Sequence, residues 1–112
     1  MSRKLTKRNI PERFFHELVN YCSSNPDISK VILFGSRARG DFRLNSDLDL
    51  AIRTKDITHS EQNLINDRIQ EMPTALKIDV VFLDRLTKKG LINNIKQEGV
   101  IIYEEGKALR EA

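Results

Sequence analysis

The sequence lacks the features that mark secreted and membrane-spanning proteins. Its one cysteine, Cys22, has no partner for an internal disulfide and falls on the apolar face of a predicted helix, where we expect a buried free thiol. No apolar run approaches the roughly 20 residues that span a bilayer. No apolar stretch follows the basic N-terminus, as a secretory signal would require. These absences favour a cytoplasmic protein without a transmembrane helix.

Positive charge is in only mild excess, with a formal net charge of +3. Much of the excess lies within the first eight residues, at Arg3, Lys4, Lys7 and Arg8. Such an arm can bind nucleic acid through phosphates. No aromatic residues alternate with these cations to stack on bases, and a short charged terminus is usually a solvated tail. Direct nucleic-acid binding is therefore the less favoured interpretation of the arm.

Length and composition predict one small domain. Hydrophobic residues make up 39% and charged residues 31% of the 112 residues, which is ordinary for a globular protein. No repeat, linker or low-complexity segment divides the chain. We expect a basic N-terminal arm over residues 1–10, one domain over 11–105 and a C-terminal tail over 106–112.

Three segments have the periodicity of amphipathic helices. The first covers residues 11–23, with Pro11 suited to the first helical position because its missing N–H is not needed there. The second is predicted to begin at Thr58, which has capping-box spacing to Glu61. Thr87 is a cap candidate for the third helix, and Gly99 fits its C-terminal stop. The inward side chains expected on the second helix are Leu64, Ile65, Ile69 and Met72.

Four short segments have the composition of β-strands. They are residues 30–35, 47–53, 77–83 and 100–103. Residues 36–46 contain two glycines and many polar residues, which predicts a turn, a short helix and a loop. Strands that alternate with helices indicate an α/β (α+β) fold, with a small mixed sheet of about four strands packed against helices.

A glycine–serine pair ends the first predicted strand and is a candidate phosphate site. Gly35 lets the backbone bend and a phosphate approach, and Ser36 can donate its hydroxyl and its N–H. Arg37 and Arg39 add positive charge nearby. The stretch Gly35 to Gly40 fits the start of a P-loop, but Asp41 and Phe42 stand where that motif needs lysine and serine or threonine, so a P-loop is excluded. Taken alone, a Gly-Ser pair is more often an ordinary turn.

Two aspartates open the second predicted strand. Asp47 and Asp49 would project on the same side, about 6 to 7 Å apart, because successive strand residues alternate between faces. Their charges repel unless a cation lies between them, and aspartate is disfavoured in strands. The competing interpretation is a turn at Asp47 and a solvated side chain at Asp49.

A third aspartate interrupts the next apolar strand. Asp79 needs a partner or a cation if it is buried. If this strand lies beside residues 47–53, three carboxylates can gather around one or two hard cations, and their oxygen ligands suit Mg²⁺ or Mn²⁺. Two metals could align an attacking hydroxyl with a triphosphate. Asp79 is then the best candidate to accept the proton of that hydroxyl.

These residues together resemble a known family. Gly35-Ser36, then Asp47-x-Asp49 after ten intervening residues, and Asp79 within a later strand are similar to the minimal nucleotidyltransferases of the DNA polymerase beta superfamily. The strings 35–40 and 46–50 also resemble that family, and the likeness covers nearly the whole chain.

The resemblance implies a nucleotidyltransferase fold and a magnesium-dependent transfer of AMP from ATP to a hydroxyl. Carried over by position, Gly35 and Ser36 would hold the triphosphate, with Arg37 and Arg39 as plausible phosphate contacts. Asp47, Asp49 and Asp79 would be the catalytic and metal-ligating residues.

The resemblance also implies a partner. Small members of the family pair with a HEPN-domain protein as the antitoxin of a toxin–antitoxin module, and they look able to transfer AMP onto a tyrosine of the toxin. Two alternatives stay open. One is an enzyme that acts on a small hydroxylated molecule, and the other is an antitoxin that neutralises its partner by binding alone.

Overall fold

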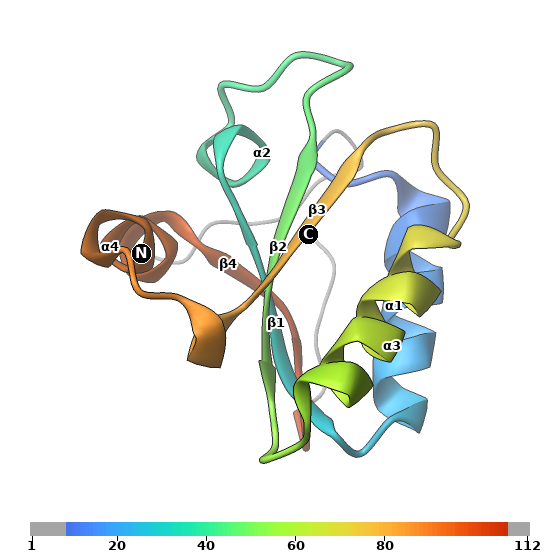
Figure 1. Cartoon of the computed structure of the whole chain (residues 1–112). Coiled ribbons are helices and arrows are strands. Elements are labelled where there is room, and N and C mark those ends of the chain that lie inside the picture. The colour runs from blue at the N-terminus through green and yellow to red at the C-terminus, as the bar shows by residue number, and fades with distance from the viewer. Residues whose placement is uncertain (1–8, 108–112) are drawn as a thin grey trace.

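The computed structural model describes residues 9–107, which form a mixed four-stranded sheet with helices on both faces (Figure 1). Strand order is β3-β2-β1-β4. The strands are β1 (Ile28–Phe34), β2 (Leu48–Thr54), β3 (Ile78–Phe82) and β4 (Val100–Glu104). β1 is antiparallel to β2 and to β4, whereas β2 and β3 are parallel. The predicted fold class is confirmed.

The helices lie in two layers. α1 (Glu12–Ser24) and α3 (His59–Gln70) cover one face of the sheet, and α4 (Lys89–Glu98) lies on the other face with the short 3₁₀ helix η1 (Leu83–Arg85) (Figure 1). The four-residue helix α2 (Ser36–Arg39) follows β1 directly. No helix among residues 9–107 is long and apolar enough to cross a membrane.

The main core lies between the sheet and α1 with α3. Leu48, Leu50 and Ile52 point to this side from β2 and are fully buried, as their alternation predicts. They pack in one cluster with Phe14 and other residues of α1. Cys22 is part of the same cluster, which confirms that it is a buried free thiol.

A smaller cluster fills the opposite face. Phe34 of β1, Ala51 of β2 and Ile95 of α4 are its buried members. Ala51 and Asp49 are two residues apart on β2, so their side chains point to the same face of the sheet. α4 covers this face at Ala51. The site is therefore restricted to the end where β2 begins.

Element boundaries differ from the predictions by one or two residues. Pro11 is the residue before α1, with φ −58° and ψ 133°, so the prediction that it occupies the first helical position is wrong by one residue. The strands begin and end up to two residues from the predicted limits. One consequence matters for function, because β2 begins at Leu48 and Asp47 therefore precedes the strand.

Two of the four helix signals are confirmed. The capping box at Thr58 and Glu61 is present in full. The cap at Thr87 is wrong, since Lys88 precedes α4 and makes no capping bond with its side chain. Gly99 does end α4, but with φ −65° rather than a left-handed conformation. A Cβ at Gly99 would clash with the carbonyl oxygen of Ile95, so close packing and not a turn requires glycine there.

The buried side of α3 is rotated by part of a turn from the prediction. Leu64 is 64% exposed, so its expected inward position is wrong. Gln62, Ile65 and Ile69 are the buried residues, and their spacing of three and four residues forms one stripe. Gln62 can take a core position because its amide donates to Thr54 Oγ1 at 3.1 Å and to Asp84 Oδ1 at 2.9 Å.

Two predictions fall outside the described residues. They are the basic arm's cations, Arg3, Lys4, Lys7 and Arg8, and residues 108–112 of the predicted C-terminal tail. Ile10, which the sequence predicts to be part of the arm, is 3% exposed and packs in the main core.

Candidate active site

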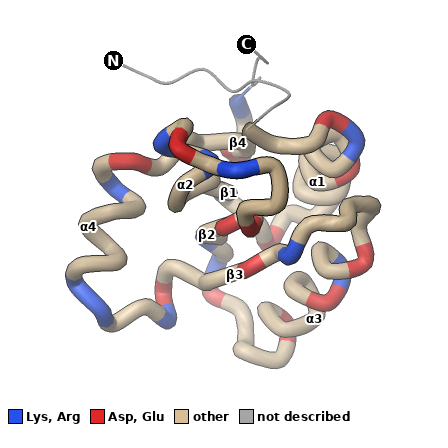
Figure 2. The backbone as a smooth tube through the Cα atoms, turned by 90° about the horizontal axis from the view of Figure 1, so that it is seen from above, with Lys and Arg blue, Asp and Glu red and all other residues tan. Residues whose placement is uncertain are grey.

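Strand pairing brings the Gly35-Ser36 turn and two aspartates to one end of the sheet. Because β1 and β2 are antiparallel, Phe34 at the end of β1 pairs with Asp49 near the start of β2. Because β2 and β3 are parallel, Asp49 in turn pairs with Asp79 near the start of β3. Gly35 and Ser36 come directly after Phe34. Figure 2 shows acidic positions on neighbouring stretches of β2 and β3.

Two separate constraints require a glycine at position 35. Its φ of 75° and ψ of −158° lie in a region that only glycine populates readily. A Cβ at this position would also clash with Oδ2 of Asp49 and lie 3.3 Å from its Cγ. The missing side chain thus allows the backbone of the turn to lie directly against the Asp49 carboxylate.

The electrostatics of Asp49 reflect this crowding. Its pKa is raised from 3.8 to about 6, chiefly by burial and then by the charges of Asp79 and Asp47 and a hydrogen bond with the Asp79 side chain. Lys77 has the opposite, smaller effect. The effect of Asp47 indicates that its charge also acts on Asp49, although Asp47 itself precedes the strand.

The sequence suggests that a buried Asp79 would need a partner or a cation. In the structure this argument applies better to Asp49, the residue that pairs with Asp79. The Asp79 side chain is 43% exposed, and it pairs with the ammonium of Lys77 at 3.7 Å. Lys77 was not among the predicted site residues. Its spacing of two residues from Asp79 could have identified it, since such residues share one face of a strand.

The carboxylates suit a hard divalent cation that arrives with a phosphate ligand. Among residues 9–107, no three His, Cys, Asp or Glu side chains are arranged as a ready-made metal site. Mg²⁺ does not need one, because it is usually held by one or two carboxylates together with substrate phosphates. Asp49 and Asp79 provide such a pair beside the turn, and their repulsion is the observation that favours a cation there.

Arg37 has a different environment from the one expected of a phosphate contact. It is 3% exposed, and its guanidinium donates to the carbonyl oxygens of Ser46 at 2.9 Å and Leu44 at 2.9 Å. A further N–H donates to the carbonyl oxygen of Asn9 at 3.2 Å. Arg37 therefore braces the segment that leads to Asp47. Its contact with phosphate stays a prediction.

Arg39 lies on the surface between two carboxylates. Its guanidinium is 3.2 Å from Asp41 Oδ2 and 3.1 Å from Glu98 Oε2, which raises its pKa. The pair with Glu98 connects α2 to the end of α4. A phosphate contact of Arg39 would have to compete with both partners, and it too stays a prediction.

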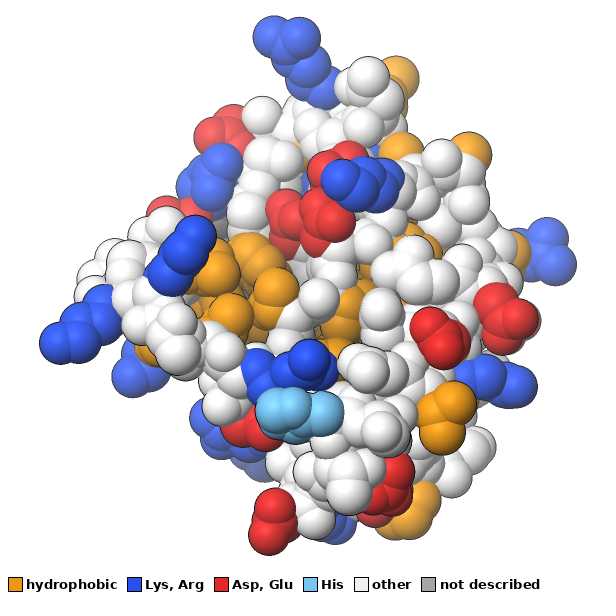
Figure 3. Space-filling model, in the orientation of Figure 1, with side chains coloured by type: hydrophobic (Ala, Val, Ile, Leu, Met, Phe, Trp, Pro, Cys, Tyr) orange, Lys and Arg blue, Asp and Glu red, His pale blue; other side chains and the backbone are white. Residues whose placement is uncertain are grey.

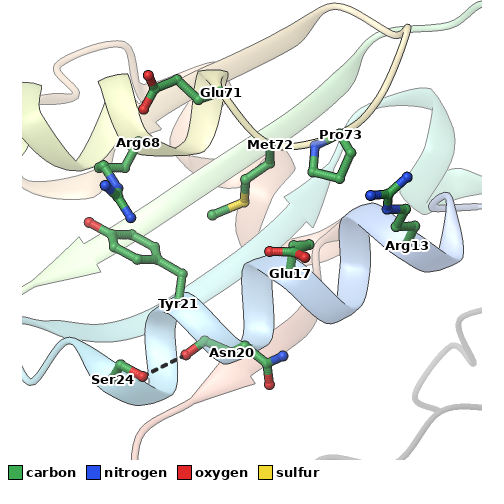
Figure 4. A pocket seen from close by; sticks show the side chains of 9 residues that line it. All are labelled: Arg13, Glu17, Asn20, Tyr21, Ser24, Arg68, Glu71, Met72 and Pro73. Atoms are coloured by element: carbon green, nitrogen blue, oxygen red, sulfur yellow. Dashed lines mark hydrogen bonds between the residues drawn. The ribbon is translucent and has the colours of Figure 1, made fainter.

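Acidic, basic and hydrophobic side chains occupy separate areas of the surface around the candidate site. Acidic side chains gather near the centre of the face in Figure 3, with a basic side chain in front of them and a hydrophobic area below. A groove of about 570 Å³ lies elsewhere, between α1 and α3, and none of the predicted site residues lines it (Figure 4). In that groove the Arg68 guanidinium lies 5.8 Å from the centre of the Tyr21 ring.

The fold is similar to several solved structures. A toxin–antitoxin MntA–HpeT crystal structure superimposes with a TM-score of 0.64 at 17% identity, covering 82% of this chain and 74% of the other. A toxin–antitoxin structure with AMP-PNP gives 0.58 at 20% identity, covering 87% and 76%. The structure of a tri-AMPylated Shewanella oneidensis HEPN toxin in complex with an MNT antitoxin gives 0.59 at 15% identity, covering 81% and 70%.

Sequence comparison places the chain more firmly. No protein with a curated description matches it significantly. The family model for the polymerase beta nucleotidyltransferases matches residues 16–108, which includes the turn, all three aspartates and every strand. The chain therefore belongs to the polymerase beta nucleotidyltransferase family.

Proposed function

We propose that this protein transfers AMP from ATP to a tyrosine hydroxyl of a partner HEPN-domain toxin, and so acts as the antitoxin. The observation that carries the proposal is the pairing of Asp49 with Asp79 beside the Gly35-Ser36 turn. It combines a phosphate-sized turn with carboxylates on the same end of the sheet. The partner class rests on the similarity to MNT antitoxins solved with HEPN toxins, one of them AMPylated.

In this proposal Gly35 and Ser36 bind the triphosphate, while Asp47, Asp49 and Asp79 would hold Mg²⁺. When bound, Mg²⁺ would supply positive charge that offsets the charge of the phosphates and of the leaving pyrophosphate. Lys77, beside Asp79, adds a positive charge at the rim of the site. In this proposal the protein works in the cytoplasm, where ATP is available.

The transfer itself needs one proton acceptor. The acceptor oxygen forms a bond to the α-phosphorus, and the bond from that phosphorus to the bridging oxygen of the β-phosphate breaks. Pyrophosphate leaves with the electron pair of the broken bond. Asp79 accepts the proton of the attacking hydroxyl, because its side chain is 43% exposed and can reach an incoming substrate.

The test is to incubate the chain with ATP, Mg²⁺ and its proposed HEPN-domain partner, sought at the neighbouring gene, and to measure the intact mass of that partner. We expect a mass increase of one or more AMP groups, located on tyrosine by peptide mapping. Asp47→Asn and Asp79→Asn should each lower the rate by roughly a hundredfold or more. Asp67→Asn, which changes an exposed aspartate of α3, is the matched control and should act normally.

The alternatives predict different results. A complex that forms without any mass increase, under conditions where ATP·Mg²⁺ also fails to bind, would show an antitoxin that acts by binding alone. AMP transfer to a small hydroxylated molecule with no transfer to the protein would favour the small-molecule enzyme.

A further inference from the structure

We propose that the tip of the loop between α2 and β2 is the docking element for the protein that receives AMP. The loop covers residues 41–47, and its tip is Leu44 with Arg43 beside it. This inference rests on the proposed function, since it names the surface through which that site would meet its protein substrate.

The tip exposes an apolar side chain that folding does not explain. Leu44 is 90% exposed, the highest value among the large hydrophobic residues that the structure describes. It stands in a tight turn, because Ser46 N–H donates to the Arg43 carbonyl at 3.0 Å. Glycine, proline, asparagine, aspartate and serine are the usual residues of such turns. A leucine there adds nothing to the stability of the isolated chain.

The loop is nevertheless held rigidly. Arg37 donates to the carbonyls of Leu44 and Ser46, both at 2.9 Å, and its guanidinium lies 4.8 Å from the centre of the Phe42 ring. Ser46 Oγ accepts from the N–H of Arg43 at 2.8 Å. A buried arginine committed to main-chain carbonyls fixes the loop before any partner arrives, which lowers the entropy cost of docking.

The position of the loop tip indicates which kind of molecule would bind to it. Leu44 is three residues from Asp47, so their Cα atoms are at most about 11 Å apart. Figure 1 shows the loop projecting beyond the sheet at the end where β2 begins. A partner that covers Leu44 is therefore held beside the carboxylates. The triphosphate of ATP has no apolar part to meet Leu44, and a contact of its adenine with Leu44 would lower the nucleotide affinity in the test below. The surface instead fits a protein with an apolar recess that is bordered by a carboxylate to meet the exposed Arg43.

The test compares Leu44→Asp with Leu64→Asp. Leu64 is a matched control, because it is also an exposed leucine, 64% accessible, but lies on α3. Three quantities are measured for each variant: the affinity for Mg²⁺ with a non-hydrolysable ATP analogue, the affinity for the adjacent-gene HEPN-domain protein without nucleotide, and the rate of AMP transfer to that protein.

We expect Leu44→Asp to weaken complex formation and to slow transfer by at least tenfold, with unchanged nucleotide affinity, while Leu64→Asp behaves as the wild type. Equal behaviour of both variants overturns the proposal. So does a change in self-association of the chain alone, since the leucine would then contact a second copy. If the wild type transfers no AMP, the proposed function fails, but loss of the complex only in Leu44→Asp would still support the docking tip.

Discussion

At the scale of the residue, Gly35 shows how closely the site depends on one position. Its backbone conformation and its contact with the Asp49 carboxylate each exclude a side chain. A glycine that ends a strand could be read from the sequence as a turn. Its second constraint could not, because Asp49 is fourteen residues away in the chain and reaches Gly35 only through the pairing of β1 with β2.

Gly35→Ala should lower the free energy of unfolding by about 3 kcal/mol or more, because a strained backbone costs about 1 to 3 kcal/mol before the clash is added. Urea denaturation measures the change. Gly106→Ala is the control, since Gly106 also has a positive φ, 79°, but no atom within 4 Å of an added Cβ. It should lose only about 1 to 2 kcal/mol.

The clash can be separated from the strain by a double-mutant cycle. In an Asp49→Ala background the carboxylate that meets the new Cβ is gone, so Gly35→Ala should cost less there than in the wild type. Equal costs in the two backgrounds would mean that Asp49 does not constrain Gly35.

At the scale of the element, α3 shows why a hydrophobic residue is not always the buried one. Thr58 and Glu61 set the start of this helix as the sequence predicts. Its rotation about its own axis is set by tertiary contacts, which turn Gln62 inward and Leu64 outward. The decisive contacts are the hydrogen bonds of Gln62 to Thr54 in β2 and to Asp84 in η1. Neither partner could be assigned before the layers were known.

Gln62→Ala should destabilise the protein by about 2 to 3 kcal/mol, because it leaves a cavity and removes the amide that donates to Asp84. Leu64→Ala on the same helix should change stability by no more than about 0.5 kcal/mol. Chemical denaturation of both variants provides the measurement, and a larger loss for Leu64→Ala would contradict the observed rotation of α3.

At the scale of the whole molecule, the single thiol lies in the one core that joins α1, α3 and the sheet. Burial raises the pKa of Cys22 from 9.0 to about 12. Between these values the unfolded chain releases the proton and the folded protein keeps it. The stability that is linked to the protonated Cys22 thiol is therefore fully present below pH 9 and is lost as the pH rises toward 12.

Native protein at pH 9 should therefore react with iodoacetamide at least about 500-fold more slowly than protein in 8 M urea, from the difference in thiolate fraction alone. Mass spectrometry follows the labelling of Cys22. The rate should rise along the urea unfolding curve measured by circular dichroism, because only global unfolding exposes this core. Rapid labelling of the native protein would show that α1 opens independently.

The sequence by itself determined the order of helices and strands and the residue types of the site. These follow from local periodicity, from capping and from the cost of placing aspartate in apolar strands. It also carried the resemblance to nucleotidyltransferases, which the family match confirms.

Only the tertiary structure decided which of these residues meet. Strand order and direction place Asp49 between the Gly35 turn and Asp79, and no local pattern encodes that pairing. Packing likewise turned Arg37 inward to brace the loop and left Leu44 exposed at its tip. The physical reason is the same in each case: contacts between residues distant in sequence depend on how whole layers pack, whereas periodicity reports only the neighbours along the chain.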